Sequence, residues 1–139
     1  MRPSAVVIDT NVLVASGFKP RSHSAQIVEQ VRCGQLQMVW TEQTRAEAAF
    51  IVGNIPPLSW QAIAVLFRPE NCYDGVLLVD KFQHIPDKAD IKFAALSDAT
   101  GAPLITMDKV LLSIRETLSV AMWTPFEFLE LETCSSQGG

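Results

Sequence analysis

The sequence lacks a run of basic residues, a cysteine framework and a long hydrophobic segment. Its 11 Lys and Arg residues are outnumbered by 15 Asp and Glu residues, which gives a formal charge of −4. A protein that binds nucleic acid by neutralising many phosphates needs a broad basic surface, so the composition argues against that class. It does not exclude an enzyme in which bound cations, rather than lysines, face a phosphate.

The three cysteines, Cys33, Cys72 and Cys134, cannot all pair within one chain, and none belongs to a C-x-x-C motif. This pattern suggests neither a zinc knuckle nor a disulfide framework, and we expect reduced thiols in a cytoplasmic protein. The longest apolar run is Ala62 to Phe67, far short of the roughly 20 residues that span a bilayer. Asp9 interrupts what would be a signal-peptide core, so we expect neither export nor membrane association.

What the chain does contain is enough apolar material for one domain. It has 139 residues, of which 48% are hydrophobic and 19% charged, as expected for a single globular unit. We predict a domain over residues 1–134 and a flexible polar tail over residues 135–139.

Apolar runs alternate with amphipathic stretches along the whole chain. The alternation predicts an α/β fold with a mainly parallel, five-stranded sheet. The expected strands are residues 5–8, 37–40, 75–80, 103–106 and 120–123. The expected helices are residues 11–16, 22–33, 41–53, 59–67, 90–100 and 111–118 and a last one from Pro125.

Local signals at the helix ends support these assignments. Ser22 or Ser24 is expected to cap the second helix. Thr44 and Glu47 have the spacing of a capping box. Gly101 is expected to end the helix that precedes it in a left-handed conformation.

Four acidic residues stand where such a sheet would bring them together. Asp9 follows the first strand directly, and Asp108 comes just beyond residues 103–106. Asp90 opens a helix, and Glu47 lies about one turn inside another. Ligands of open α/β sheets bind at the carboxyl ends of the strands, near a switch in strand order. We therefore expect the four carboxylates to converge at one edge of the sheet.

Clustered carboxylates repel one another, and burying them unpaired is costly. The usual solution is a divalent cation with hard oxygen ligands, here Mg²⁺ or Mn²⁺. Such an ion polarises a phosphodiester and supplies a hydroxide nucleophile. No Ser, Cys or His triad competes for this role, because His23 and His84 stand without a partner motif and are expected at the surface.

The segments that carry these acids resemble, in order and spacing, the four motifs of PIN-domain nucleases. Val6–Val14 resembles their opening strand and turn, and Thr41–Glu47 is similar to the second motif, where a capping Ser or Thr precedes the acid by six residues. Asp87–Phe93 resembles the third, an acid pair before Lys-Phe, although Lys88 stands where many relatives have proline. Leu104–Lys109 resembles the fourth.

The resemblance covers residues 5–129 and implies a PIN-like three-layer α/β/α fold. It also implies a divalent-metal-dependent endoribonuclease that cleaves single-stranded RNA. The closing segment Trp123–Leu129 is similar to the end of bacterial PIN proteins described as toxin components of toxin–antitoxin pairs. A short antitoxin protein and a homodimer or higher assembly are therefore the expected partners besides RNA.

The resemblance assigns a role to each of the four acids. Asp9 would be the central metal ligand, and Asp90 and Asp108 would complete the metal shell. Glu47 would hold or orient metal-bound water. All four are the expected catalytic residues.

Four further residues are expected to support the centre. The hydroxyl of Thr10 or Thr106 would donate a hydrogen bond to a ligand carboxylate or a phosphate oxygen. Asn11 would hold the turn after the first strand. Asp87 is the alternative to Asp90 as the metal ligand of the third motif.

Each acid also has a purely structural alternative. Asp9 and Asp90 could only cap the helices that follow them, and Glu47 could only complete the capping box with Thr44. Asp98 lies two turns into the helix that Asp90 opens and could also point toward the site. Five basic residues near the motifs could either surround the pocket and meet RNA or serve as exposed charge: Lys19, Arg21, Lys81, Lys92 and Lys109.

Two other functional classes of α/β protein match the sequence poorly. A receiver-like phosphoacceptor domain needs paired acids after its first strand, and a haloacid-type phosphatase needs Asp-x-Asp where this chain has Asp9-Thr10-Asn11. The stronger alternative is a non-catalytic PIN module that binds RNA or a protein. An antitoxin peptide would lie across the acidic pocket, and the apolar stretches 22–33 and 59–67 are candidates for that groove or for a homodimer face.

Overall fold

The computed structural model describes the backbone of residues 3–138 and the side chains of residues 3–131. The strands are β1 (Ala5–Ile8), β2 (Gln37–Met38), β3 (Leu104–Ile105) and β4 (Met122–Trp123). The α-helices are α1 (Thr10–Phe18), α2 (His23–Arg32), α3 (Glu42–Gly53), α4 (Trp60–Ala64), α5 (Ile91–Thr100), α6 (Lys109–Ser113) and α7 (Pro125–Gly138). Short 3-10 helices are η1 (Pro69–Asn71), η2 (Val79–Phe82), η3 (Lys88–Asp90) and η4 (Arg115–Thr117).

The four strands form one parallel sheet in the order β2-β1-β3-β4. From β1 the chain passes first to β2 on one side, and later to β3 on the other, where Val7 is aligned with Leu104. Strand order therefore reverses at β1, and the carboxyl ends of β1 and β3 lie next to each other. In a parallel sheet this is where a ligand site is expected.

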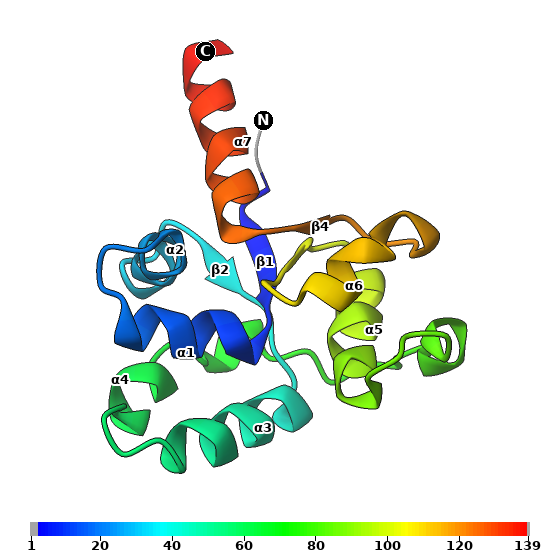
Figure 1. Cartoon of the computed structure of the whole chain (residues 1–139), viewed down its shortest axis with the longest axis horizontal. Helices are drawn as coiled ribbons and strands as arrows, with labels where there is room; N and C mark the ends of the chain where they lie inside the picture. Colours follow the sequence, from blue (N-terminus) through cyan, green and yellow to red (C-terminus); the bar gives the residue numbers. More distant parts are fainter. Residues whose placement is uncertain (1–2, 139) are drawn as a thin grey trace.

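Helices cover both faces of the sheet, as the alternation along β1 requires. Val6 and Ile8 belong to the core beneath α1, α2 and α3, whereas Val7 belongs to the core beneath α5 and α6. Figure 1 shows the first group of helices on one side of β1 and the second on the other. Phe128 of α7 is fully buried in the first core. The result is the expected α/β/α arrangement of three layers.

The predicted strand at residues 75–80 is wrong, so the sheet has four strands rather than five. Cys72 takes the place beside Trp40 instead, in a single parallel bridge in which the Tyr73 N–H donates to the Trp40 carbonyl. The Tyr73 hydroxyl then donates a hydrogen bond to the Val76 carbonyl, and the chain leaves the edge of the sheet after this bridge. Val76 is 76% exposed, and residue 79 already begins η2. An apolar, β-branched run thus remains outside the sheet.

Two of the predicted helix-end residues are confirmed, and one predicted capping box is wrong. Ser22 caps α2, and Gly101 ends α5 with a φ of 76°. The capping box of α3, however, joins Thr41 with Thr44 rather than Thr44 with Glu47. The purely structural role suggested for Glu47 is therefore filled by Thr44, and the carboxylate of Glu47 is left for other contacts.

Among the described helices, none is both long and apolar enough to cross a bilayer. The backbone of α7 is described to Gly138, whereas the side chains from residue 132 onward, including Cys134, lie outside the described part. The division into a domain of residues 1–134 and a tail stays a prediction. Of the other cysteines, Cys33 and Cys72 are free thiols.

Candidate functional site

The end of β1 and the end of β3 are joined by one buried hydroxyl. Thr106, which is fully buried, donates a hydrogen bond of 2.8 Å to Oδ2 of Asp9. The same hydroxyl accepts one of 3.1 Å from the Asp108 N–H. Asp9 is only 4% exposed, and its Oδ1 accepts a long bond from the backbone of Asn11 at 3.5 Å. Thr106 therefore fixes one oxygen of Asp9 and the backbone of Asp108 together.

Asp108 is a helix cap as well as a candidate ligand. Its Oδ1 accepts hydrogen bonds from the backbone N–H groups of Val110 and Leu111, at 2.9 and 3.1 Å, and so caps α6. Its second carboxylate oxygen accepts no hydrogen bond from the described residues. One oxygen of Asp108 is thus structural, and the other can serve as a ligand.

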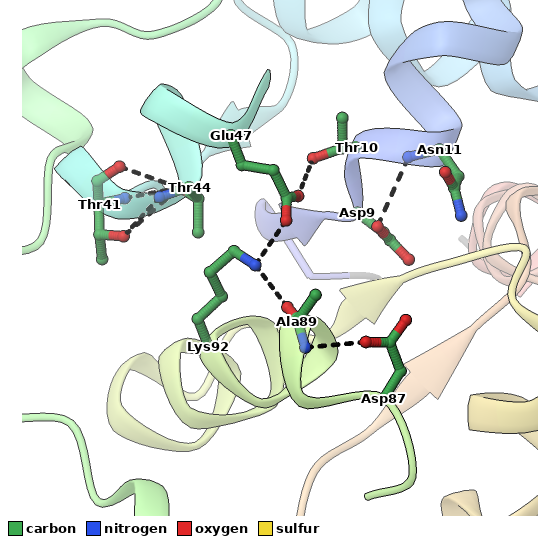
Figure 2. A network of polar contacts seen from close by, with 9 residues as sticks. All are labelled: Asp9, Thr10, Asn11, Thr41, Thr44, Glu47, Asp87, Ala89 and Lys92. Atoms are coloured by element: carbon green, nitrogen blue, oxygen red, sulfur yellow. Dashed lines mark hydrogen bonds and ion pairs between the residues drawn. The ribbon is translucent and has the colours of Figure 1, made fainter. Parts of the chain in front are cut away.

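Glu47 reaches the site from α3 and is held at both oxygens. Thr10 donates a hydrogen bond of 2.6 Å to Oε2, and Lys92 lies 2.6 Å from Oε1 in an ion pair. Lys92 also donates to the carbonyl of Ala89, just before Asp90. Figure 2 shows Lys92 extending from α5 to Glu47 across the space between the two helices.

The third motif separates its two acids into different environments. Asp87 is exposed and caps η3 by accepting a 2.9 Å hydrogen bond from the N–H of Ala89. Asp90 is only 8% exposed and makes no capping hydrogen bond to α5. Among the described residues, no group donates a hydrogen bond to its carboxylate. Asp87 therefore caps the short helix η3, and Asp90 does not fill the capping role suggested for it at the start of α5.

Burial and neighbouring acids raise the proton affinity of Asp90 and of Asp9. Burial, followed by the nearby charges of Asp9, Asp108 and Asp87, raises the pKa of Asp90 to about 7, against a smaller opposite effect of Lys92. Burial also raises the pKa of Asp9, although its hydrogen bonds from Thr106 and Asn11 oppose the shift. Such mutual repulsion is what a bound cation would relieve.

Asp9, Asp90 and Asp108 provide the hard oxygen donors that Mg²⁺ and Mn²⁺ prefer. Asp90 in particular is a residue only 8% exposed whose carboxylate accepts no hydrogen bond from the described residues. Among the described residues, no three His, Cys, Asp or Glu side chains come as close together as metal ligands do. The fit to a divalent ion therefore rests on the donor types of the three acids, which are all carboxylate oxygens.

Other residues considered from the sequence make no side-chain hydrogen bond or ion pair with these acids in the described part of the chain. Asp98 forms an exposed ion pair with Lys81 at 3.1 Å and accepts from Ser119, so it belongs to the surface. His23 and His84 are exposed, as expected. Asn11 contributes its backbone N–H to Asp9, whereas its side chain is exposed.

The inward position of Lys92 is the feature that sequence reasoning missed. It was considered only as a charge that either meets RNA or faces solvent, yet it is 9% exposed. A signal was present, because Lys92 interrupts an apolar stretch in which residues 91–97 are all buried. A lysine buried in such a stretch has to be paired.

A divalent ion held by these acids would bind more weakly after replacement of Thr106 by valine, because Asp9 would lose its hydroxyl partner. Loss of that bond raises the pKa of Asp9 further, and a metal ligand has to be deprotonated. We expect the dissociation constant for Mn²⁺ to rise by about 10- to 100-fold, the usual range for groups that orient metal ligands. Calorimetric titration measures it. Thr106→Ser keeps the hydroxyl and should bind normally; equal weakening in both variants would contradict the role of the hydrogen bond.

Comparison with known proteins identifies the family but no near relative. No curated protein and no solved structure gives a significant match to the chain. The family model described as the PIN domain matches residues 5–109, which is well over half of the chain and includes all four acids. The chain therefore belongs to the PIN-domain family, whose members are commonly nucleases.

Proposed function

We propose that the protein is a divalent-metal-dependent endoribonuclease that cleaves single-stranded RNA. The observation that carries this proposal is Asp90, a carboxylate that is 8% exposed, receives no hydrogen bond from the described residues and lies beside Asp9 and Asp108. A stable domain does not need a buried acid whose charged form is disfavoured. A metal site does, because the charge is then balanced when the ion binds.

Asp9, Asp90 and Asp108 would hold the ion, Mg²⁺ or Mn²⁺. When bound, such an ion polarises the phosphodiester and lowers the pKa of a coordinated water. Thr106 keeps Asp9 oriented toward the site. Glu47, fixed by Thr10 and Lys92, would use the remaining lone pairs of its carboxylate to accept a hydrogen bond from the attacking water and orient it.

RNA rather than duplex DNA is the proposed substrate on the basis of charge and family. With a net charge of −4, the protein does not offer the broad basic surface with which proteins follow a duplex backbone. A short stretch of single-stranded RNA needs contact only at the metal centre and its surroundings. Lys109, which follows Asp108 and is exposed, is one cation available to such a strand.

We further propose a toxin role, in which a short antitoxin covers the enzyme. The two apolar stretches considered as partner surfaces, 22–33 and 59–67, do lie together. They border a cavity of about 740 Å³ that is lined in part by Gly17, Gln26, Arg32, Leu58, Ala62 and Ile63. This supports a groove for a peptide. Purification of the tagged chain from its native cells tests the proposal, and recovery of the chain or its homodimer alone would count against it.

The direct test of the enzyme is cleavage of an end-labelled, mixed-sequence single-stranded RNA. We expect cutting in the presence of Mg²⁺ or Mn²⁺, and none after removal of the metal with EDTA. Restoring the ion should restore the activity. Cleavage that continues in EDTA would disprove the metal mechanism. Retention of RNA without cleavage, by folded and metal-loaded protein, would instead support the alternative of a non-catalytic PIN module.

A further inference from the structure

Lys92 is a buried cation inside a site that otherwise collects negative charge. Its ammonium lies 2.6 Å from Oε1 of Glu47, donates to the Ala89 carbonyl and stands 5.0 Å from the centre of the Phe93 ring. These contacts span from α3 to η3, the short helix that ends at Asp90. Among the described residues, it is the cation paired with one of the four acids.

Both oxygens of Glu47 are engaged, one by this ammonium and the other by the Thr10 hydroxyl. Each oxygen of Glu47 thus already accepts one bond, whereas the Asp90 carboxylate and the second oxygen of Asp108 accept no hydrogen bond from the described residues. The charge of the site is thus divided. Glu47 carries its own counter-ion, whereas the three aspartates do not.

We propose that Lys92 is a built-in counter-ion that limits this centre to a single divalent ion. The ammonium neutralises Glu47 and occupies the place where a second ion would bind that carboxylate. A divalent ion on Oε1 would lie within a few ångströms of the Lys92 charge, and two cations so close repel strongly at low dielectric. The proposal rests on the proposed metal site, and it makes Lys92 a positioning residue that acts through Glu47.

The number of ions bound per chain tests the proposal without any need for activity. Equilibrium dialysis of the full chain against Mn²⁺ should give one ion for the wild type. Lys92→Met removes the charge and frees Oε1, so we expect two ions. Lys92→Arg keeps a cation and should stay at one. Lys81→Met, which removes an exposed lysine that pairs with Asp98, is the matched control and should also stay at one.

A double variant shows whether a second ion uses Glu47. Lys92→Met combined with Glu47→Gln should return the stoichiometry from two to one. Circular dichroism and thermal unfolding in EDTA establish that each variant is folded, and if Lys92→Met does not fold, Lys92→Gln takes its place. EPR of bound Mn²⁺ gives an independent signature, because two neighbouring ions couple and broaden the signal.

The possible failures are distinct. Two ions in the wild type, or one in a folded Lys92→Met variant, would overturn the role of Lys92 and leave the metal-dependent nuclease intact. A second ion that persists in the double variant would also overturn it. No Mn²⁺ bound by the folded wild type would instead remove the proposed metal site itself, and the inference with it.

Discussion

Asp9→Asn should abolish metal-dependent cleavage of RNA, with kcat/KM at least about 10³-fold lower, because a central ligand is worth several kcal/mol of transition-state stabilisation. Asparagine keeps an oxygen that can accept the 2.8 Å hydrogen bond from Thr106, whereas its amide nitrogen cannot accept the 3.5 Å bond from the Asn11 N–H. The change therefore removes the negative charge and this weak capping contact of α1. Single-turnover cleavage of end-labelled RNA in Mn²⁺ measures the loss.

The stability of this variant should change in the opposite direction. Burial raises the pKa of Asp9, so the folded protein favours its charged form less than the unfolded chain does. An uncharged amide relieves that cost, and urea unfolding in EDTA should show a variant at least as stable as the wild type. In Mn²⁺ the order should reverse, because the wild type alone gains binding free energy. Lower activity together with higher metal-free stability is characteristic of a functional residue.

Asp98→Asn is the matched control for this experiment. It makes the same chemical change at an acid that pairs with Lys81 on the surface. We expect wild-type cleavage and a small change in stability, because exposed ion pairs contribute about 1 kcal/mol or less. Wild-type cleavage by the Asp9 variant would overturn the proposed centre. Equal losses in both variants would mean that the assay reports folding rather than chemistry.

The sequence was most informative where apolar pattern and acid position coincide. The run Ala5–Ile8 predicted a buried strand that ends at Asp9, and β1 is that strand and the one at which the order of the sheet reverses. The acids after β1 and β3 could be placed for the same reason. A carboxylate directly after a parallel strand has little freedom to be anywhere except at the edge of the sheet.

Residues 76–79 show the limit of that reasoning. They have the composition of a buried strand, yet Val76 and Leu78 are largely exposed. Cys72, rather than residues 76–79, pairs with Trp40. This contact depends on the tertiary structure, and the periodicity of the sequence does not predict it. Strand propensity describes fitness for a pleated, half-buried surface, and it does not determine which segment occupies the edge.

At the site, sequence reasoning placed the acids but not their pairing. The spacing of Thr44 and Glu47 imitated a capping box, whereas Thr41 and Thr44 form the real one. This left Glu47 free to meet Lys92, a residue 45 positions away. Such a contact depends on how α3 and α5 are brought together, so no local pattern predicts it. For the third motif the sequence favoured Asp90 over Asp87, and the structure adds that Asp90 is buried whereas Asp87 is exposed.

The free energy of unfolding of the metal-free protein should fall as the pH rises from about 4 to 7. Asp90 has a pKa of about 7 in the folded protein, against 3.8 for an ordinary aspartate. Between these values the folded state holds a proton that the unfolded chain has released. Stability is therefore greatest at the acidic end and is lost as the pH approaches 7, with a slope of up to about 1.4 kcal/mol per pH unit.

Urea unfolding in EDTA between pH 4.5 and 8 measures this slope, and Asp90→Asn should flatten it. The raised pKa of Asp9 acts in the same direction and leaves a residual slope in the variant. Glu127 does not interfere, because Arg115 lowers its pKa to about 2 and its contribution is lost only at more acidic pH. An unchanged slope in the Asp90 variant would show that this carboxyl ionises normally.

Divalent metal should reverse the dependence. Ion binding requires the charged form of Asp90, so in saturating Mg²⁺ stability should rise toward neutral pH, where the metal-free protein is weakest. The same repulsion that raises the pKa of Asp90 beside Asp9 and Asp108 would then be the source of the metal's stabilising effect. A pH profile that is identical with and without Mg²⁺ would show that Asp90 does not bind the metal. The proposed reason for its burial would then be wrong.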